Sequence, residues 1–217
     1  ISVKICGLKT DRALEAALSG GAAYVGFIFF PKSPRHIALE DASRLSALAC
    51  GRAQSVAVSV NADDSMLESI VTTVQPDILQ LHGSESPERL AAIKRRFGLP
   101  VIKALAIRDR ADLDLVNPYR GIADRFLFDA KPPVGSDLPG GNGVSFDWTL
   151  LSGLDSDIDY MLSGGLNVGN IATALNQTKA NSIDVSSGVE SAPGSKDISL
   201  IAEFFEAVAA ARQRLSA

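Results

Sequence analysis

The feature that most constrains the fold is an alternation of short apolar runs with longer stretches of helical spacing, repeated eight times along 217 residues. Several of the apolar runs are hydrophobic on both faces, which is typical of strands buried in a parallel sheet. We predict strands at Val3–Cys6, Tyr24–Phe29, Ser55–Val60, Ile78–Leu81, Val101–Ala106, Arg125–Phe128, Tyr160–Leu162 and Ile183–Val185.

A helical pattern follows each apolar run. The predicted helices are Thr10–Leu18, Glu40–Ala49, Ser65–Val74, Pro87–Phe97, Arg110–Val116, Phe146–Leu151, Val168–Asn176 and Ile198–Leu215. Eight strands that alternate with helices favour a single (β/α)8 TIM barrel, so we predict one domain over residues 1–217. The segment Lys131–Val144 is rich in glycine and proline and is predicted as a long, functional loop.

Composition and charge exclude several classes of partner. The net charge of −4 argues against a nucleic-acid binder, which would need a basic face. No apolar run approaches the roughly 20 residues of a membrane span, and no signal peptide is visible. The two cysteines, Cys6 and Cys50, indicate neither a disulfide framework nor a zinc site. We therefore expect a reducing compartment, the cytoplasm, and no membrane partner.

In such barrels the active site lies at the carboxyl ends of the strands. Two of the predicted strands end in small, donor-rich turns, Ser163-Gly164-Gly165 after the seventh and Ser186-Ser187-Gly188 after the eighth. Barrels often bind phosphate at this position, with backbone N–H groups and serine hydroxyls around the phosphate oxygens. We predict a phosphate site there, to which a short helix after Gly188 would add its N-terminal dipole.

Other strand ends carry candidates for acid–base chemistry. Asp129 follows an apolar run, where a carboxylate is costly unless it is solvated or paired. Cys6 ends the first strand and is either a reactive thiol or a small buried hydrophobe. For Arg35, in a proline-rich loop, a solvated surface charge is the default. A cysteine base, an aspartic acid, a guanidinium and a phosphate anchor together suit proton transfers on a phosphorylated sugar that carries an acidic group.

The motifs that surround these residues resemble those of the phosphoribosylanthranilate isomerase family, in the same order and spacing. They are KICGLKT at Lys4–Thr10, GFIFFPKSPRHI at Gly26–Ile37, LQLHG at Leu79–Gly83, FLFDAKPP followed by GGNGVSFDW, LSGGLN at Leu162–Asn167, and DVSSGVESAPGSKD at Asp184–Asp197. The similarity extends from the first strand to the last helix.

The resemblance implies an Amadori rearrangement in tryptophan biosynthesis, with neither cofactor nor metal. The substrate would be N-(5-phosphoribosyl)anthranilate and the product 1-(2-carboxyphenylamino)-1-deoxyribulose 5-phosphate. By motif position Cys6 would be the general base, Asp129 the general acid, and Arg35 the partner of the anthranilate carboxylate. The resemblance also implies substrate contacts for His82 and Asp184, and phosphate binding by Gly164, Gly165, Ser186, Ser187 and Gly188.

Two alternatives stay open at this point. Another phosphosugar barrel is one of them: indole-3-glycerol-phosphate synthase would need a catalytic lysine, for which an inward-facing Lys103 is the only candidate. The related isomerase of histidine biosynthesis would have an aspartate in place of Cys6. The second alternative is a phosphate-binding barrel without turnover. Either a monomer or a homodimer is compatible with the sequence.

Overall fold

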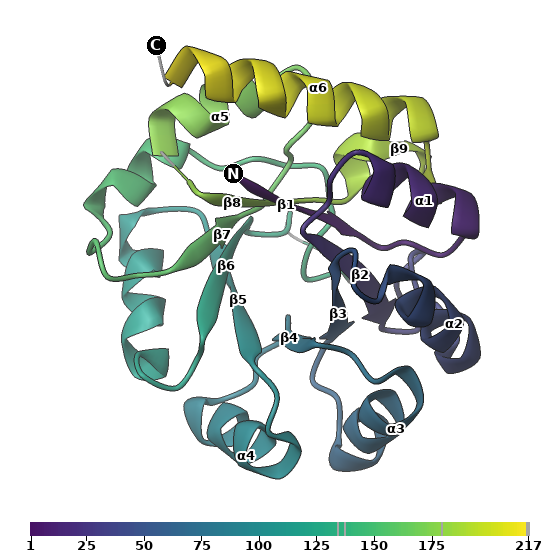
Figure 1. Cartoon of the computed structure of the whole chain (residues 1–217). Helices are drawn as coiled ribbons and strands as arrows, with labels where there is room; N and C mark the ends of the chain where they lie inside the picture. The colour runs from purple at the N-terminus through teal and green to yellow at the C-terminus, as the bar shows by residue number, and fades with distance from the viewer. Residues whose placement is uncertain (134, 137, 179, 216–217) are drawn as a thin grey trace.

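Eight parallel strands form a closed barrel in chain order, from β1 to β8 (Figure 1). The computed structural model describes residues 1–133, 135–136, 138–178 and 180–215. Residues 134 and 137 of the predicted loop, and 216–217 of the predicted domain, lie outside the described residues. The strands are β1 Ser2–Cys6, β2 Tyr24–Phe29, β3 Gln54–Ser59, β4 Ile78–Leu81, β5 Val101–Ile107, β6 Arg125–Ala130, β7 Tyr160–Leu162 and β8 Ser182–Val185. The predicted TIM barrel is confirmed.

The helices lie outside the ring of strands (Figure 1). They are α1 Asp11–Ser19, α2 Leu39–Ala49, α3 Asp64–Val74, α4 Pro87–Phe97, α5 Ile171–Thr178 and α6 Ile198–Leu215. Local sequence sets their limits: the Ser86 hydroxyl accepts from the Arg89 N–H at the start of α4, and Gly98 ends α4 in a left-handed conformation.

After β5 and β6 the chain forms 3-10 helices, η1 Arg110–Tyr119 and η2 Trp148–Gly153, where we predicted ordinary helices. Pro118 lies inside η1, and proline removes an N–H donor that an α-helix would use. Val116 is the one fully buried residue of η1. Little apolar surface therefore stabilises a longer α-helix at this position.

Side chains alternate between two compartments along each strand, as strand geometry requires. One set fills the interior of the barrel with an apolar cluster of Cys6, Val56, Val58, Ile78, Ile102, Ala104, Leu127 and Met161. The other set packs outward beneath the helices and includes the buried rings of Phe27 and Phe128. The same cluster contains the buried ring of Phe204 on α6. Polar side chains that alternate in step with this interior set also point into the barrel, and those at the strand ends reach its mouth.

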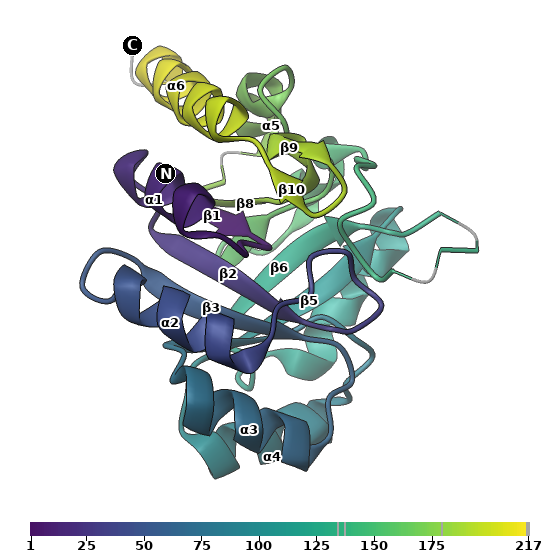
Figure 2. The ribbon, with the colours of Figure 1, turned by 90° about the vertical axis from the view of Figure 1, so that its right-hand side faces the viewer.

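Between β8 and α6 the chain forms a 3-10 turn, η3 Ser187–Val189, and a small hairpin of β9 Glu190–Ala192 and β10 Ser195–Lys196. The predicted short helix after Gly188 is therefore wrong. Pro193 and Gly194, which has a φ of +79°, form the tight turn of the hairpin and favour it over a helix. The hairpin lies between the end of β8 and the start of α6 (Figure 2).

Helix α6 packs against α1 and α5 beside the junction of β8 and β1 (Figure 1). Phe204, the large residue at its centre, is fully buried. We expect Phe204→Ala to lower the free energy of unfolding by about 3–5 kcal/mol, because it removes a buried ring and leaves a cavity. Urea denaturation measures this loss. Glu206→Ala, at an exposed position of the same helix, is the control and should change stability by less than about 0.5 kcal/mol. Equal losses in the two variants would contradict the role of buried Phe204 in the packing of α6.

Candidate active site

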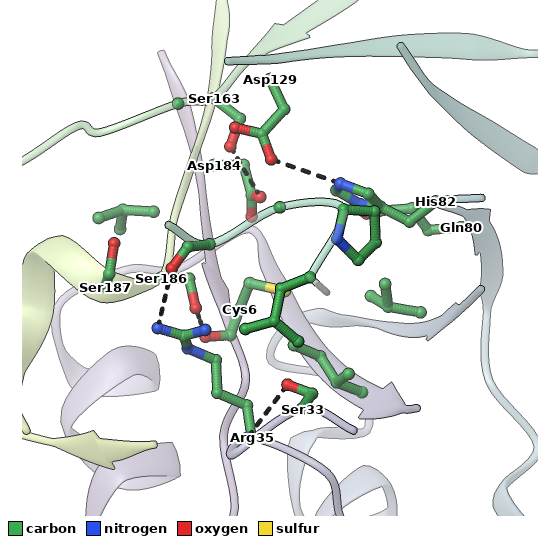
Figure 3. A pocket seen from close by; sticks show the side chains of 18 of the residues that line it. Cys6, Ser33, Arg35, Gln80, His82, Asp129, Ser163, Asp184, Ser186 and Ser187 are labelled. Atoms are coloured by element: carbon green, nitrogen blue, oxygen red, sulfur yellow. Dashed lines mark hydrogen bonds and ion pairs between the residues drawn. The ribbon is translucent and has the colours of Figure 1, made fainter. Parts of the chain in front are cut away.

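A single pocket at the carboxyl ends of the strands contains nine of the ten site residues predicted from the sequence (Figure 3). These nine are Cys6, Arg35, His82, Asp129, Gly164, Gly165, Asp184, Ser186 and Ser187. Gly188, the tenth, does not line the pocket, and a Cβ at this position would overlap the carbonyl of Leu166. The loop residues Leu138–Gly141 cover part of the opening.

The Cys6 thiol lines this pocket and is buried. Gly26 on β2 makes room for it, because a Cβ there would lie 2.9 Å from the Cys6 sulfur. Burial raises the pKa of the thiol, and the nearby ammonium groups of Lys4 and Lys196 lower it by less. Cys6 is therefore a weakly acidic thiol in a buried position with two cations beside it.

Lys4 lies inside the barrel on β1, and its Nζ donates to Asp184 Oδ1 on β8 at 2.9 Å. The other carboxylate oxygen of Asp184 accepts from the Ser163 hydroxyl at 3.3 Å. Burial lowers the pKa of Lys4, but the nearby Asp184 carboxylate and Cys6 together outweigh this and raise it overall, so the lysine stays charged. The sequence analysis did not assign Lys4 to the site, although a lysine within an apolar strand was a signal for it.

Asp129 and His82 face each other across the barrel mouth, with 3.4 Å between Asp129 Oδ2 and His82 Nε2 (Figure 3). The amide nitrogen of Gln80 on β4 lies 3.0 Å from His82 Nδ1 and holds the imidazole ring in place. Asp129 Oδ1 accepts from the Ala130 N–H at 2.8 Å. Gly140 lies directly against both side chains, where a Cβ would overlap them. Gln80 is a further site residue that the sequence analysis missed.

Arg35 is buried, which corrects the expectation of a solvated surface charge. Its Nε and Nη2 donate to the two carboxylate oxygens of Glu190, each at 2.8 Å. Nη2 also donates to the Gly141 carbonyl at 3.2 Å. Glu190 was not predicted as a site residue, and no local pattern in the sequence indicates its pairing with an arginine 155 positions away.

The two small turns after β7 and β8 lie side by side as the sequence predicted. Gly164 and Gly165 have φ values of +88° and +64°, which other residues rarely adopt. A Cβ at Gly165 would also lie 2.8 Å from the Ser145 nitrogen. The Ser186 hydroxyl donates to the Cys6 carbonyl at 3.0 Å, and Lys196 Nζ donates to the Ser186 carbonyl at 2.8 Å. The two turns are therefore held closely, with their backbones exposed to the pocket.

The lysine that a synthase would need points away from this pocket. Lys103 Nζ donates to Glu85 at 2.8 Å and to the Gly83 carbonyl at 2.6 Å, and it lies above the ring of Tyr119 in the outer layer. Within the described residues no cluster of three His, Cys, Asp or Glu side chains is placed to hold a metal ion. Over the same part of the chain, none of the helices has the length and hydropathy to cross a membrane.

Comparison with known proteins agrees with this arrangement. Residues 3–207 match the family model of N-(5'phosphoribosyl)anthranilate (PRA) isomerase. The chain is 66% identical over 209 residues to the N-(5'-phosphoribosyl)anthranilate isomerase of Brucella canis, covering 96% of this chain and 94% of that protein.

Solved structures are similar over the whole barrel. The phosphoribosyl anthranilate isomerase of Thermotoga maritima is 34% identical with a TM-score of 0.87, over 97% of this chain and 99% of that one. A second isomerase structure, in complex with reduced 1-(o-carboxyphenylamino)-1-deoxyribulose 5-phosphate, is 33% identical with a TM-score of 0.84 over the same shares. The chain therefore belongs to the N-(5'-phosphoribosyl)anthranilate isomerase family, whose reaction is a step of tryptophan biosynthesis.

Proposed function

We propose that Cys6 is the general base and Asp129 the general acid in the isomerisation of phosphoribosylanthranilate. The observation that carries the proposal is their placement: both line one pocket, at the ends of β1 and β6. Asp129 gives a proton to the ribose ring oxygen, the C1–O bond breaks, and the anilino nitrogen forms a Schiff base with C1. Cys6 then removes the proton from C2. The electron pair of the broken C2–H bond forms the C1–C2 double bond of an enolamine while the C1–N double bond becomes single, and the enolamine tautomerises to the ketone.

His82 and the Ala130 N–H support the acid step. Asp129 becomes a carboxylate when it has given up its proton, and these two donors, at 3.4 Å and 2.8 Å, stabilise the charge that forms. Gln80, whose amide nitrogen lies 3.0 Å from His82 Nδ1, holds the ring with Nε2 toward Asp129. The acid is thereby oriented toward the ring oxygen of the substrate, and His82 contributes to the ribose region without itself exchanging a proton.

The two anionic ends of the substrate have separate partners in this proposal. The backbone of Gly164, Gly165 and Ser186, with the hydroxyl of Ser187, surrounds the 5'-phosphate. The Ser186 hydroxyl itself donates to the Cys6 carbonyl. Arg35 binds the anthranilate carboxylate, because a planar guanidinium fits a planar carboxylate in two parallel hydrogen bonds. The isomerase of the ligand complex binds a reduced form of the product that carries the same two anionic groups, which supports this assignment.

Asp184 lies between these two ends, next to Ser163 and beneath the mouth of the barrel. Its charge is already balanced by Lys4, so it accepts hydrogen bonds without adding a free negative charge to an anionic substrate. We place it at the ribose hydroxyls for this reason. Gly188 acts indirectly in this proposal, by letting the turn after β8 approach the turn after β7.

We also infer that residues 1–217 form one domain, since β1 and β8 pair directly and close a single barrel. A cytoplasmic location and a monomer or homodimer stay predictions. One structure of the Thermotoga maritima relative is described as monomers generated from a dimeric enzyme.

Cys6→Ser and Asp129→Asn should each lower kcat by a factor of about 10²–10⁴, the usual contribution of a general base or acid. The decay of phosphoribosylanthranilate fluorescence, with substrate generated in situ, measures this. Cys50→Ser is the matched control, because Cys50 is exposed and does not line the pocket, and it should keep wild-type activity. Activity that survives in both pocket variants would contradict the acid–base assignment. A wild type that does not accelerate the decay would favour a phosphate-binding barrel without turnover.

The reactivity of Cys6 should rise with pH through the alkaline range. Burial raises the pKa of its thiol, so the thiolate is scarce at neutral pH and increases about tenfold per pH unit below that pKa. We expect the alkylation rate of Cys6 by iodoacetamide, measured in a Cys50→Ser background, to keep rising above pH 8.5, the ordinary pKa of a free thiol. Bound product analogue should protect the thiol. A plateau below pH 8 would show a lowered pKa and contradict this account.

Gly188→Ala should raise KM for the phosphorylated substrate by about tenfold or more, with a smaller effect on kcat. A Cβ at this position overlaps the Leu166 carbonyl, so the two phosphate-binding turns must separate. Steady-state kinetics and inhibition by inorganic phosphate measure the change. Gly169→Ala is the control. Gly169 follows the turn after β7, and a Cβ there meets only a side-chain oxygen at 3.3 Å. Equal KM values in the wild type and Gly188→Ala would contradict the role of close packing.

A further inference from the structure

Glu190, the first residue of β9, holds two buried cations of the active site together. Its carboxylate accepts from Nε and Nη2 of Arg35, each at 2.8 Å, and from Nζ of Lys196 at 2.7 Å. The side chains of all three residues are at most 5% exposed to solvent. A contact of this kind, bidentate and nearly dry, fixes the plane of the arginine as well as its position.

The orientation of the Arg35 guanidinium follows from this contact. Glu190 occupies the Nε–Nη2 edge of the guanidinium. The adjacent edge, formed by Nη1 and Nη2, therefore points away from Glu190. That edge faces the pocket residue Gly141, whose carbonyl accepts from Nη2 at 3.2 Å and where a Cβ would lie 2.6 Å from Nη1. The Gly141 carbonyl oxygen therefore lies where an oxygen of a substrate carboxylate would bind.

The net charge of this cluster explains why it can still bind an anion although Arg35 is already paired with Glu190. In formal charges Arg35 and Lys196 contribute +1 each and Glu190 contributes −1, so the cluster has a formal net charge of +1. Burial raises the pKa of Glu190, but hydrogen bonds from Arg35 and the charge of Lys196 outweigh this and lower it overall. Glu190 therefore stays ionised, which keeps a buried guanidinium paired while leaving one positive charge for the substrate.

The hairpin that carries Glu190 is itself attached to the loop that carries Arg35. The Gly194 N–H donates to Glu190 Oε2 at 3.2 Å, and the Gly194 backbone packs so closely on the Pro34 carbonyl that a Cβ would overlap it. Lys9 Nζ donates to that same carbonyl at 2.8 Å. Both partners of the Arg35–Glu190 pair are thus held before any substrate arrives, which reduces the cost of ordering the arginine on binding.

We propose that Glu190 is a positioning residue for substrate recognition: it holds one edge of Arg35 and thereby presents the other edge to the ring carboxylate of the substrate. The inference rests on the assignment of Arg35 to that carboxylate under the proposed function. Glu190 itself touches no reacting atom. It determines the preference of the site for an anilino sugar phosphate that carries a carboxylate over one that does not.

The test compares two ligands that differ only in this carboxylate: reduced 1-(o-carboxyphenylamino)-1-deoxyribulose 5-phosphate and its phenylamino analogue without the carboxylate. Their Kd values are measured by calorimetry for the wild type, Glu190→Gln, Glu190→Asp and Arg35→Met. Glu190→Asp keeps the negative charge beside Lys196 and shortens only the reach, so it serves if Glu190→Gln does not fold. Glu85→Gln is the matched control, because it breaks the other buried lysine–glutamate pair, on the outer side of the barrel.

We expect Glu190→Gln and Glu190→Asp to weaken the carboxylated ligand by about tenfold or more, a loss of about 1.4 kcal/mol, and the uncarboxylated ligand by less than about twofold. Glu85→Gln should lower thermal stability and leave the ratio of the two Kd values unchanged. An equal loss for both ligands in the Glu190 variants, or no loss for either, would overturn the inference. If Arg35→Met also leaves the ratio unchanged, the assignment of Arg35 fails. If Arg35→Met abolishes the ratio while the Glu190 variants keep it, only the role of Glu190 fails.

Discussion

The ion pair between Lys4 and Asp184 lies inside the barrel at the junction of its first and last strands. The two residues are direct neighbours in the register of β1 and β8, and their charged groups are 2.9 Å apart. A slip of one residue would turn one partner to the outer layer and leave a buried charge unpaired, which is strongly destabilising. The register that satisfies the pair also places Cys6 beside Ser186, whose hydroxyl donates to the Cys6 carbonyl. Closure of the barrel and assembly of the site therefore depend on the same alignment of strands.

Much of this arrangement could be predicted from the sequence, because a parallel barrel converts position along a strand into position in space. The strand limits agree with the prediction to within two residues, and the residues at strand ends converge as that architecture requires. Cys6, His82 and Asp129 are distant along the chain, yet each follows an apolar run and each reaches the pocket. What each of them does there stays a prediction, since position alone does not distinguish a catalytic carboxylate from a supporting one.

The features that sequence analysis missed depend on long-range pairing. Lys4 was recognisable only as a polar residue within a strand, and its partner lies 180 positions away. Arg35 was expected at the surface because proline-rich loops usually are, but the hairpin after η3 covers it and supplies Glu190. The hairpin stands where a short helix was expected to support the phosphate site, because Pro193 and Gly194 favour a tight turn. The 3-10 segments replaced two helices that had been predicted from helical spacing, because sparse apolar contacts do not stabilise α-helices there.

The buried cations Lys4, Lys196 and Arg35 near Cys6 are each paired with a carboxylate. Lys4 is paired with Asp184, and Lys196 and Arg35 share Glu190, so each of these buried cations has a carboxylate within 2.9 Å. The pairing matters for the proposed role of Cys6 as a base, because an uncompensated ammonium beside the thiol would stabilise the thiolate and make it a weaker base toward a carbon-bound proton. Compensated cations lower the pKa of the thiol by less than burial raises it. In the proposed function, backbone dipoles then bind the phosphate and one edge of the guanidinium binds the carboxylate. The same proposal requires that the thiolate of Cys6, when it forms, be basic enough to remove the proton from C2.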